Sequence, residues 1–100
     1  MTRRIVLRPQ AEADIEEAAA WYSERNPRLG SDFVQMVDQA VSAIAAFPFR
    51  FPKVQEDVRR APLEKFPYRL VYEVTEDEVL VLGCRHVRRK PEHWPRPGRR

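Results

Sequence analysis

Cysteine and glycine are scarce in this sequence, and their scarcity excludes several kinds of functional site. Cys84 is the single cysteine, so neither an internal disulfide nor a metal site built from several thiolates can form. Three well-separated glycines leave no glycine-rich loop to cradle a phosphate. His86 and His93 have no cluster of cysteine or carboxylate ligands near them. We therefore expect no metal and no cofactor, and we interpret Cys84 as buried packing because its neighbours are apolar.

Long hydrophobic runs are also missing. No apolar stretch approaches the roughly 20 residues that a membrane helix requires, and the N-terminus, MTRRIVLRPQ, lacks the apolar centre of a signal peptide. The chain has 100 residues, of which 43% are hydrophobic and 33% charged, a balance typical of one globular domain. We expect a cytoplasmic protein with no membrane contact, whose residues 1–90 form a single domain and whose residues 91–100 form a basic, proline-rich tail.

Charge is distributed unevenly along the chain. The net charge is +3, but residues 85–100 hold seven arginines and lysines against one glutamate, so the rest of the chain is acidic on balance. Such asymmetry favours an anionic partner, either nucleic acid or an acidic protein segment. The alternative is a basic terminus that only aids solubility.

Two helices are predicted in the first half of the chain. Residues 10–25 carry apolar side chains at helical spacing: Ala11, Ile15, Ala18 and Tyr22. The acidic residues between them are interpreted as the solvated face of this helix: Glu12, Asp14, Glu16 and Glu17. The short NPRLG connection then leads to a second helix, with Ser31 as its N-cap and Pro48 as its end. Because the connection is so short, the helices should lie antiparallel as a hairpin.

Strands are predicted on both sides of the helices. Residues 5–7 indicate a brief first strand that pairs late in the sheet, and residues 58–63 indicate an edge strand interrupted by Pro62. Residues 68–75 and 78–87 are two β-branched runs joined by a polar corner, which is typical of a hairpin. Residues 47–57 contain two prolines and three phenylalanines, so we expect a loop anchored by its aromatic rings.

The element order predicts an α+β fold, β-α-α-β-β-β, with a two-helix antiparallel hairpin packed on an antiparallel β-sheet. Two helices cover one sheet face and leave the other to water or a partner. In the strand over residues 68–74, Tyr68, Leu70, Tyr72 and Val74 should face the helices. Arg69 should then lie on the opposite face.

The candidate site that remains is basic, and its residues fall on neighbouring strands. They are Arg59, Arg60, Lys65, Arg69, Arg85, His86, Arg88, Arg89 and Lys90. Guanidinium groups hold phosphates and stabilise the charge that develops in phosphoryl transfer. The alternative is a set of solvated positions on an open sheet. Aromatic residues outside the strands are interpreted as core and anchoring residues: Trp21, Tyr22, Phe47, Phe49 and Phe51.

Short motifs in this order resemble the RelE/ParE superfamily of type II toxins, which are found in bacterial toxin-antitoxin modules. The motifs are A-x-x-D-I-E-E-A-x-x-W-Y over residues 11–22, N-P-R-L-G over 26–30, F-x-x-x-V over 33–37, the loop 47–52, F-P-Y-R-L-V-Y-E-V over 66–74, and H-V-R-R-K-P-x-x-W over 86–94. The resemblance implies the helical hairpin on a sheet derived above. It also implies neutralisation by an antitoxin whose largely helical segment wraps the toxin.

The superfamily has two activities, and the resemblance implies different residue roles for each. RelE-like members cut messenger RNA in the ribosomal A site. Matched through Y-R-L-V-Y, Arg69 falls on a position that is a catalytic arginine in such nucleases, and counting on through the hairpin Arg89 falls on a second. Arg60 falls near a functional lysine. The tyrosine that follows the last strand in these nucleases has no counterpart here, where Trp94 and Pro95 stand. An indole cannot act as a general acid or base, so the ribonuclease reading lacks its proton-transfer group.

W-Y in the first helix, the FPY opening and the ending H-x-R-R-x-P-x-x-W are more similar to the ParE-like and plasmid-stabilisation branch. We therefore favour a growth-inhibiting toxin that blocks DNA gyrase. The alternatives are a ribosome-dependent mRNA endoribonuclease and a non-toxic RNA- or protein-binding module on the same fold. The residues expected to bind the target or an acidic antitoxin are Arg60, Lys65, Arg85, His86, Arg88, Lys90 and Trp94.

Overall fold

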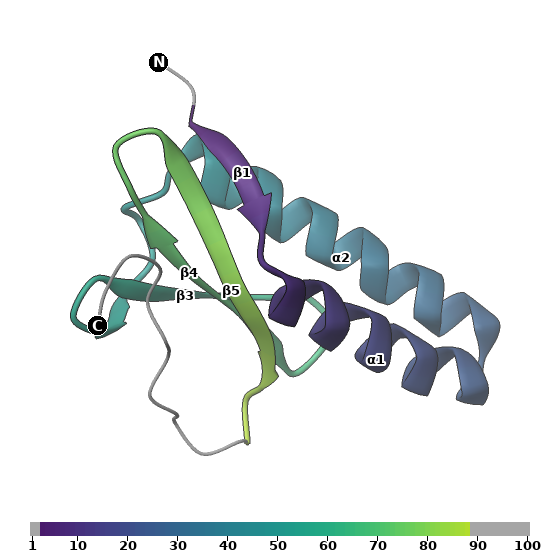
Figure 1. Ribbon diagram of the computed structural model, residues 1–100. Helices are drawn as coiled ribbons and strands as arrows, with labels where there is room; N and C mark the ends of the chain where they lie inside the picture. Colours follow the sequence, from purple (N-terminus) through teal and green to yellow (C-terminus); the bar gives the residue numbers. More distant parts are fainter. Residues whose placement is uncertain (1–2, 89–100) are drawn as a thin grey trace.

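Two helices lie against one face of a five-stranded sheet in the computed structural model, which describes residues 3–88 (Figure 1). The elements are β1 (Arg4–Leu7), α1 (Pro9–Arg25), α2 (Pro27–Ala46), β2 (Lys53–Gln55), β3 (Val58–Pro62), β4 (Tyr68–Val74) and β5 (Glu78–His86). The predicted α+β fold with its helical hairpin is confirmed. The tail predicted over residues 91–100 lies outside the described residues.

The sheet has the order β1-β5-β4-β3-β2. The first strand pairs with the last, as expected, but β1 runs parallel to β5 whereas the other neighbours are antiparallel. The sheet is therefore mixed and not wholly antiparallel. The strands from β2 to β5 alternate in direction, and β5 at the end of this series runs in the same direction as β1.

A short strand, β2, occupies part of the stretch that was predicted as a loop. Lys53 pairs with Arg59, and Glu56 takes a positive φ of 44° in the tight turn that follows β2. Because β2 covers the outer side of β3, β3 is an inner strand and not the edge strand predicted. Pro62 is the last residue of β3, where its missing N–H group does not interrupt the strand.

The helical hairpin has no separate connecting loop. α2 begins at Pro27, earlier than the predicted N-cap at Ser31, because the Asn26 side chain accepts a hydrogen bond from the Arg28 N–H at 3.0 Å and Pro27 suits the first helical position. Gly30 lets the helices approach closely, since a Cβ there would lie 1.7 Å from Ser23 Oγ. In the described part of the chain, neither helix is long and apolar enough to cross a membrane.

The main core lies between the helices and the sheet. Tyr68, Leu70, Tyr72 and Val74 of β4 face it, as predicted from their alternation. The ring of Tyr22 packs with the rings of Phe33 and Phe66 at centroid distances of 5.6 and 4.8 Å. This aromatic cluster joins both helices to the segment that leads into β4.

The sheet face away from the helices carries a second apolar cluster. Val58, Val71, Leu80 and Leu82 are all buried, and Val6 packs against them. We expected this face to be left to water or to a partner. Its strands instead supply neighbouring apolar side chains that are buried, and charged residues lie among them, since Arg60 at the middle of β3 is across from Val71 and the buried Glu73 is across from Val58.

A hydrogen bond between α1 and β5 fixes the packing around Cys84. Asp14 Oδ2 accepts the Cys84 backbone N–H at 2.9 Å, and the Cys84 side chain is buried as predicted. Burial, with the nearby Asp14 carboxylate as a smaller cause, raises the pKa of the Cys84 thiol to about 12. The thiol is therefore protonated at neutral pH and is not a nucleophile.

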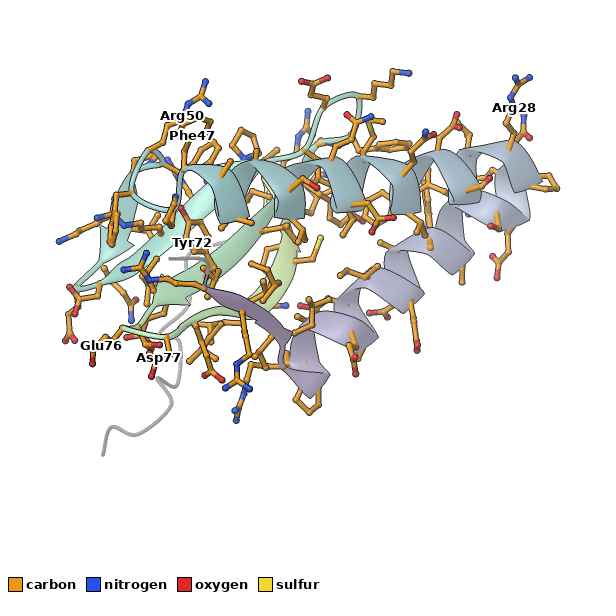
Figure 2. The ribbon with its side chains drawn as sticks, turned by 90° about the horizontal axis from the view of Figure 1, so that it is seen from above. Arg28, Phe47, Arg50, Tyr72, Glu76 and Asp77 are labelled. Atoms are coloured by element: carbon orange, nitrogen blue, oxygen red, sulfur yellow. The ribbon has the colours of Figure 1, made fainter. Side chains whose placement is uncertain are left out.

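A second hydrogen bond ties the loop after α2 to the sheet. The Tyr72 hydroxyl donates to the Pro48 carbonyl oxygen at 2.7 Å, and Phe51 packs against the main core. Phe47 and Phe49 do not anchor the loop, because each is 57% exposed. Figure 2 shows Phe47 and Arg50 at the end of the molecule where α2 ends. The anchoring role predicted for the phenylalanines therefore belongs to Phe51 and to the Tyr72 hydroxyl.

Alkylation should test the environment of Cys84. The shift of its pKa from 9.0 to about 12 lowers the thiolate fraction about a thousandfold at a pH below both values. We expect iodoacetamide at pH 8 to label the folded protein far more slowly than the urea-unfolded protein, as followed by mass spectrometry. Equal labelling rates in the two states would contradict the burial of this thiol.

The change Tyr72→Phe should lower the free energy of unfolding by about 1 kcal/mol, because it removes the bond to the Pro48 carbonyl and keeps the buried ring. Urea unfolding followed by circular dichroism measures the change. Tyr22→Phe is the matched control, since the Tyr22 hydroxyl has no hydrogen bond recorded with residues 3–88 and should matter less. A larger loss in Tyr22→Phe than in Tyr72→Phe would refute this role.

Candidate functional site

Three of the predicted basic residues gather on the sheet face away from the helices. Arg69 of β4 lies directly across from Arg85 of β5, and Arg60 of β3 lies diagonally beside Arg69. Their strand neighbours Leu70, Cys84 and Ala61 point into the main core. We call Arg60, Arg69 and Arg85 the arginine face.

Like charges and partial burial act together on Arg69. Desolvation, followed by the positive charge of Arg60, lowers the pKa of Arg69, although its guanidinium stays charged at any physiological pH. Arg69 Nη2 donates to the Val87 carbonyl oxygen at 3.2 Å, which holds the side chain near the end of β5. A bound anionic group would relieve the repulsion between the two guanidinium groups, so this arrangement suits an acidic or phosphate-bearing partner.

Two other predicted residues lie near the ends of these strands. Lys65 is exposed in the segment between β3 and β4 with a φ of 72°, and Arg88 is exposed just after β5. Arg59 stabilises the loop after α2, because its Nη1–H donates to the Phe51 carbonyl oxygen at 2.7 Å. Three further predicted residues lie outside the described part of the chain: Arg89, Lys90 and Trp94.

His86 is separated from the arginine face. It lies across from Tyr68, on the side of the sheet that the helices cover, and the two rings meet edge to face at 5.1 Å. Its Nδ1 accepts the backbone N–H of Arg88 at 3.1 Å, so the neutral ring carries its proton on Nε2. His86 therefore belongs to a different site from the three arginines.

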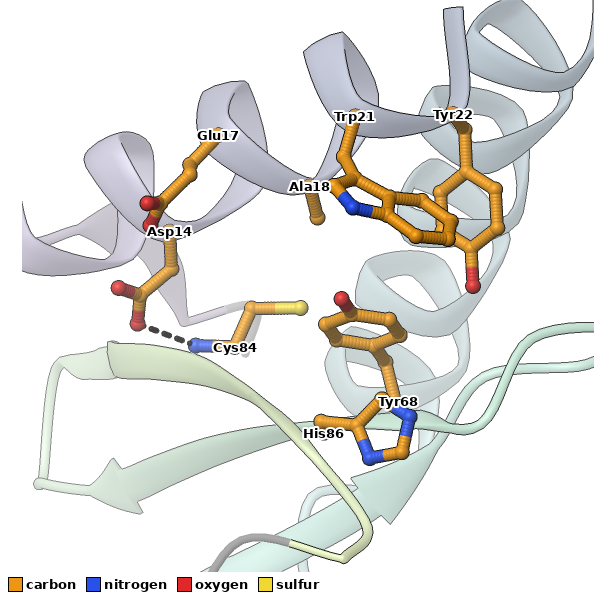
Figure 3. A pocket seen from close by; sticks show the side chains of 8 residues that line it. All are labelled: Asp14, Glu17, Ala18, Trp21, Tyr22, Tyr68, Cys84 and His86. Carbon is orange, nitrogen blue, oxygen red and sulfur yellow. Dashed lines mark hydrogen bonds between the residues drawn. The ribbon is translucent and has the colours of Figure 1, made fainter. Parts of the chain in front are cut away.

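That second site is a pocket between α1 and the adjoining ends of β4 and β5, which we call the α1 pocket (Figure 3). Its volume is about 390 Å³. It is lined by Asp14, Glu17, Ala18, Trp21, Tyr22, Tyr68, Cys84 and His86. Figure 3 shows the two carboxylates at one end and the aromatic rings at the other.

The residues of α1 that line this pocket were interpreted differently from the sequence. Asp14 is half-buried and not part of a fully solvated face, because one carboxylate oxygen accepts the Cys84 N–H and the other accepts Gln10 Nε2 at 2.8 Å. Trp21 is 49% exposed and is not a core residue. Helical spacing could have predicted the partial burial of Asp14, since Asp14 lies three residues after Ala11 and four before Ala18, on the buried side of α1.

The chemistry of the α1 pocket favours binding over nucleophilic catalysis. Its thiol is protonated and its histidine already uses Nδ1 in a backbone hydrogen bond, so nucleophilic catalysis has no activated group there. Carboxylates beside aromatic rings favour a cation with an apolar portion. The protein thus has two candidate sites of opposite charge on opposite faces of one sheet.

Comparison with protein families gives a match over most of the chain. The family described as the ParE toxin of the type II toxin-antitoxin system, parDE, matches residues 5–91. Toxin ParE2 from two strains of Mycobacterium tuberculosis is 27% identical over 92 residues, which cover 91% of this chain and 88% of that protein.

Solved structures share the fold. A chain of the chromosomal ParDE toxin-antitoxin system from P. aeruginosa superposes with a TM-score of 0.76 at 19% identity, covering 85% of this chain and 96% of that one. A chain of the toxin-antitoxin complex RelBE2 from Mycobacterium tuberculosis gives a TM-score of 0.57 at 17% identity, covering 86% and 92%. With the family match across residues 5–91, these findings show that the chain belongs to the ParE toxin family of type II toxin-antitoxin systems.

Proposed function

We propose that this ParE-family toxin inhibits DNA gyrase and is neutralised by a cognate antitoxin. The observation that carries the proposal is the family match over residues 5–91, to a family described by its parDE module. The fold agrees with the same family, because the chain has a higher TM-score with the ParDE chain than with the RelBE2 chain.

The arginine face supports a partner with acidic residues. Arg69 and Arg85 lie directly across from each other, and Arg60 adds a third positive charge that already lowers the pKa of Arg69. Carboxylates pair well with such forked donors. Both solved relatives are described as toxin-antitoxin systems or complexes, which supports an antitoxin as the partner of this chain. We infer that an acidic segment of the antitoxin covers the arginine face.

Ribosome-dependent cleavage of mRNA is the second candidate function. Its support is the clustering of Arg69 with Arg60 and Arg85, because guanidinium groups would hold and stabilise a scissile phosphate. Cleavage also requires proton transfer, which a guanidinium does not perform at neutral pH. His86 faces the helix side of the sheet, away from these arginines. We therefore rank this function below gyrase inhibition.

The purified protein should inhibit the supercoiling of relaxed plasmid by DNA gyrase. Arg69→Ala should weaken the inhibition about tenfold, because a partly desolvated charge on the arginine face would be lost. Arg28→Ala is the matched control, since Arg28 lies at the far end of the helical hairpin (Figure 2). This variant should inhibit gyrase as strongly as the parent protein.

Unchanged supercoiling and an unchanged DNA-gyrase cleavage complex would contradict gyrase as the target. Primer extension on translated mRNA is then the deciding measurement. A-site cleavage that Arg69→Ala abolishes would establish the ribonuclease function instead. Harmless expression without either activity would indicate a non-toxic binding module.

Antitoxin binding should be electrostatic and should involve the arginine face. The product of a small reading frame beside this one should restore growth when co-expressed, and calorimetry should give a complex that weakens as salt is added. We expect Arg85→Ala to weaken this complex about tenfold and Arg28→Ala to leave it unchanged. A complex that leaves Arg69 and Arg85 fully accessible would contradict the proposal.

A further inference from the structure

The α1 pocket is not used by the proposed gyrase or antitoxin contacts of the arginine face. We propose that it is a docking site for an arginine side chain presented by a partner polypeptide. The inference concerns the chemistry of this pocket alone and holds whichever macromolecule is the toxin's target.

The two carboxylates of the pocket are in no ion pair recorded within residues 3–88, and a described cation in contact with the pocket lining, Arg25, stacks on Trp21. Asp14 accepts hydrogen bonds from two neutral donors, the Cys84 N–H and the Gln10 amide. The ion pairs recorded within residues 3–88 join Arg4 to Glu78, Arg25 to Glu24 and Lys53 to Asp57, and none includes Asp14 or Glu17. Both carboxylates are therefore available to a bound cation, and they would repel a phosphate or an acidic segment.

The aromatic end of the pocket suits the rest of an arginine side chain. Trp21, Tyr22, Tyr68 and the ring of His86 form an aromatic wall, and an aliphatic stem can pack on the ring faces (Figure 3). Trp21 already stacks with a guanidinium of this chain, since the Arg25 Cζ lies 3.3 Å from the centroid of its ring. One face of the indole is therefore occupied by Arg25, and the rest of the ring remains for packing against the aliphatic stem of an incoming arginine.

Arginine fits the carboxylate end better than lysine does. Its planar guanidinium has donors in a fixed fork that can reach two carboxylate oxygens at once, whereas the lysine ammonium is a compact and strongly hydrated charge. Asp14 and Glu17 lie on one helix three positions apart, which places both carboxylates on the same side of α1. One guanidinium can therefore bridge them.

The size of the pocket favours a polypeptide over a free small cation. Its volume is about 390 Å³, whereas a cavity of about 150 Å³ already holds a benzene ring. An arginine side chain would leave room for parts of the residues that flank it. Contacts with those flanking residues are what a free cation would lack.

The first test is a titration of the full chain, labelled with ¹⁵N, with the blocked peptide acetyl-Ala-Arg-Ala-amide at low ionic strength. The Trp21 indole N–H and the Cys84 backbone N–H report on the two sides of the pocket. The counterpart peptide with citrulline has the same shape without the charge. We expect the arginine peptide to bind at least about fivefold more tightly than the citrulline peptide, with the lysine peptide in between and all differences reduced by salt.

Matched variants locate the binding. Glu17→Gln should weaken binding of the arginine peptide about threefold to fivefold, whereas Glu16→Gln, which changes an exposed neighbour outside the pocket lining, should leave it unchanged. Trp21→Leu should also weaken it, with the Cys84 N–H as reporter. Because Glu17 and Trp21 are exposed, these variants should keep the fold, which the rest of the spectrum verifies.

Three outcomes of the peptide titrations would overturn the proposal, and a fourth comes from a small-molecule probe. The three are equal binding of the arginine and citrulline peptides, equal weakening by Glu17→Gln and Glu16→Gln, and the absence of saturable shifts at the two reporter groups. Methylguanidinium is the probe for the source of the cation. Binding of methylguanidinium as tight as that of the arginine peptide would refute a polypeptide as the occupant.

Discussion

A single irregularity in the pairing of β4 with β5 decides which residues can act together. Val71 lies across from Gly83, but the next residue of β4, Tyr72, lies across from Val81, so Leu82 is an extra residue in β5. Such a bulge reverses the alternation of side chains beyond it. Val79 and Val81 face the helices before the bulge, and Cys84 faces them after it. If β5 kept regular alternation through Leu82 with no bulge, Arg85 would point toward the helices and His86 away from them.

The bulge therefore builds both candidate sites. It places Arg85 on the same face as Arg69, where the two guanidinium groups and Arg60 form a positive surface. It also turns the Cys84 and His86 side chains toward α1, where they line a pocket with two carboxylates. One sheet thus presents a positive surface on one face and a negatively charged pocket on the other. A polypeptide partner that used both would need acidic residues for the first and an arginine for the second.

Local patterns predicted most of the fold, and the errors occur where a specific hydrogen bond overrides them. Helical spacing located both helices, but it missed that Asn26 caps α2 and makes NPRLG its first turn. Proline and phenylalanine content indicated an irregular loop, whereas pairing with β3 makes Lys53–Gln55 a strand. The phenylalanines were expected to anchor that loop, but the Tyr72 hydroxyl of β4 and Phe51 hold it. In each case the deciding partner is a hydrogen bond that periodicity does not encode.

By itself, the sequence determined the order of elements, the face of β4 that meets the helices, the burial of Cys84 and the clustering of positive charge toward the C-terminus. These follow from the periodicity and composition of continuous segments, which are local properties. Only the tertiary structure decided that β1 joins β5 in parallel, that Arg85 faces Arg69 while His86 does not, and that Asp14 closes a pocket with β5. These depend on strand register and on the docking of α1, and a bulge of one residue is enough to change which face Arg85 and His86 take.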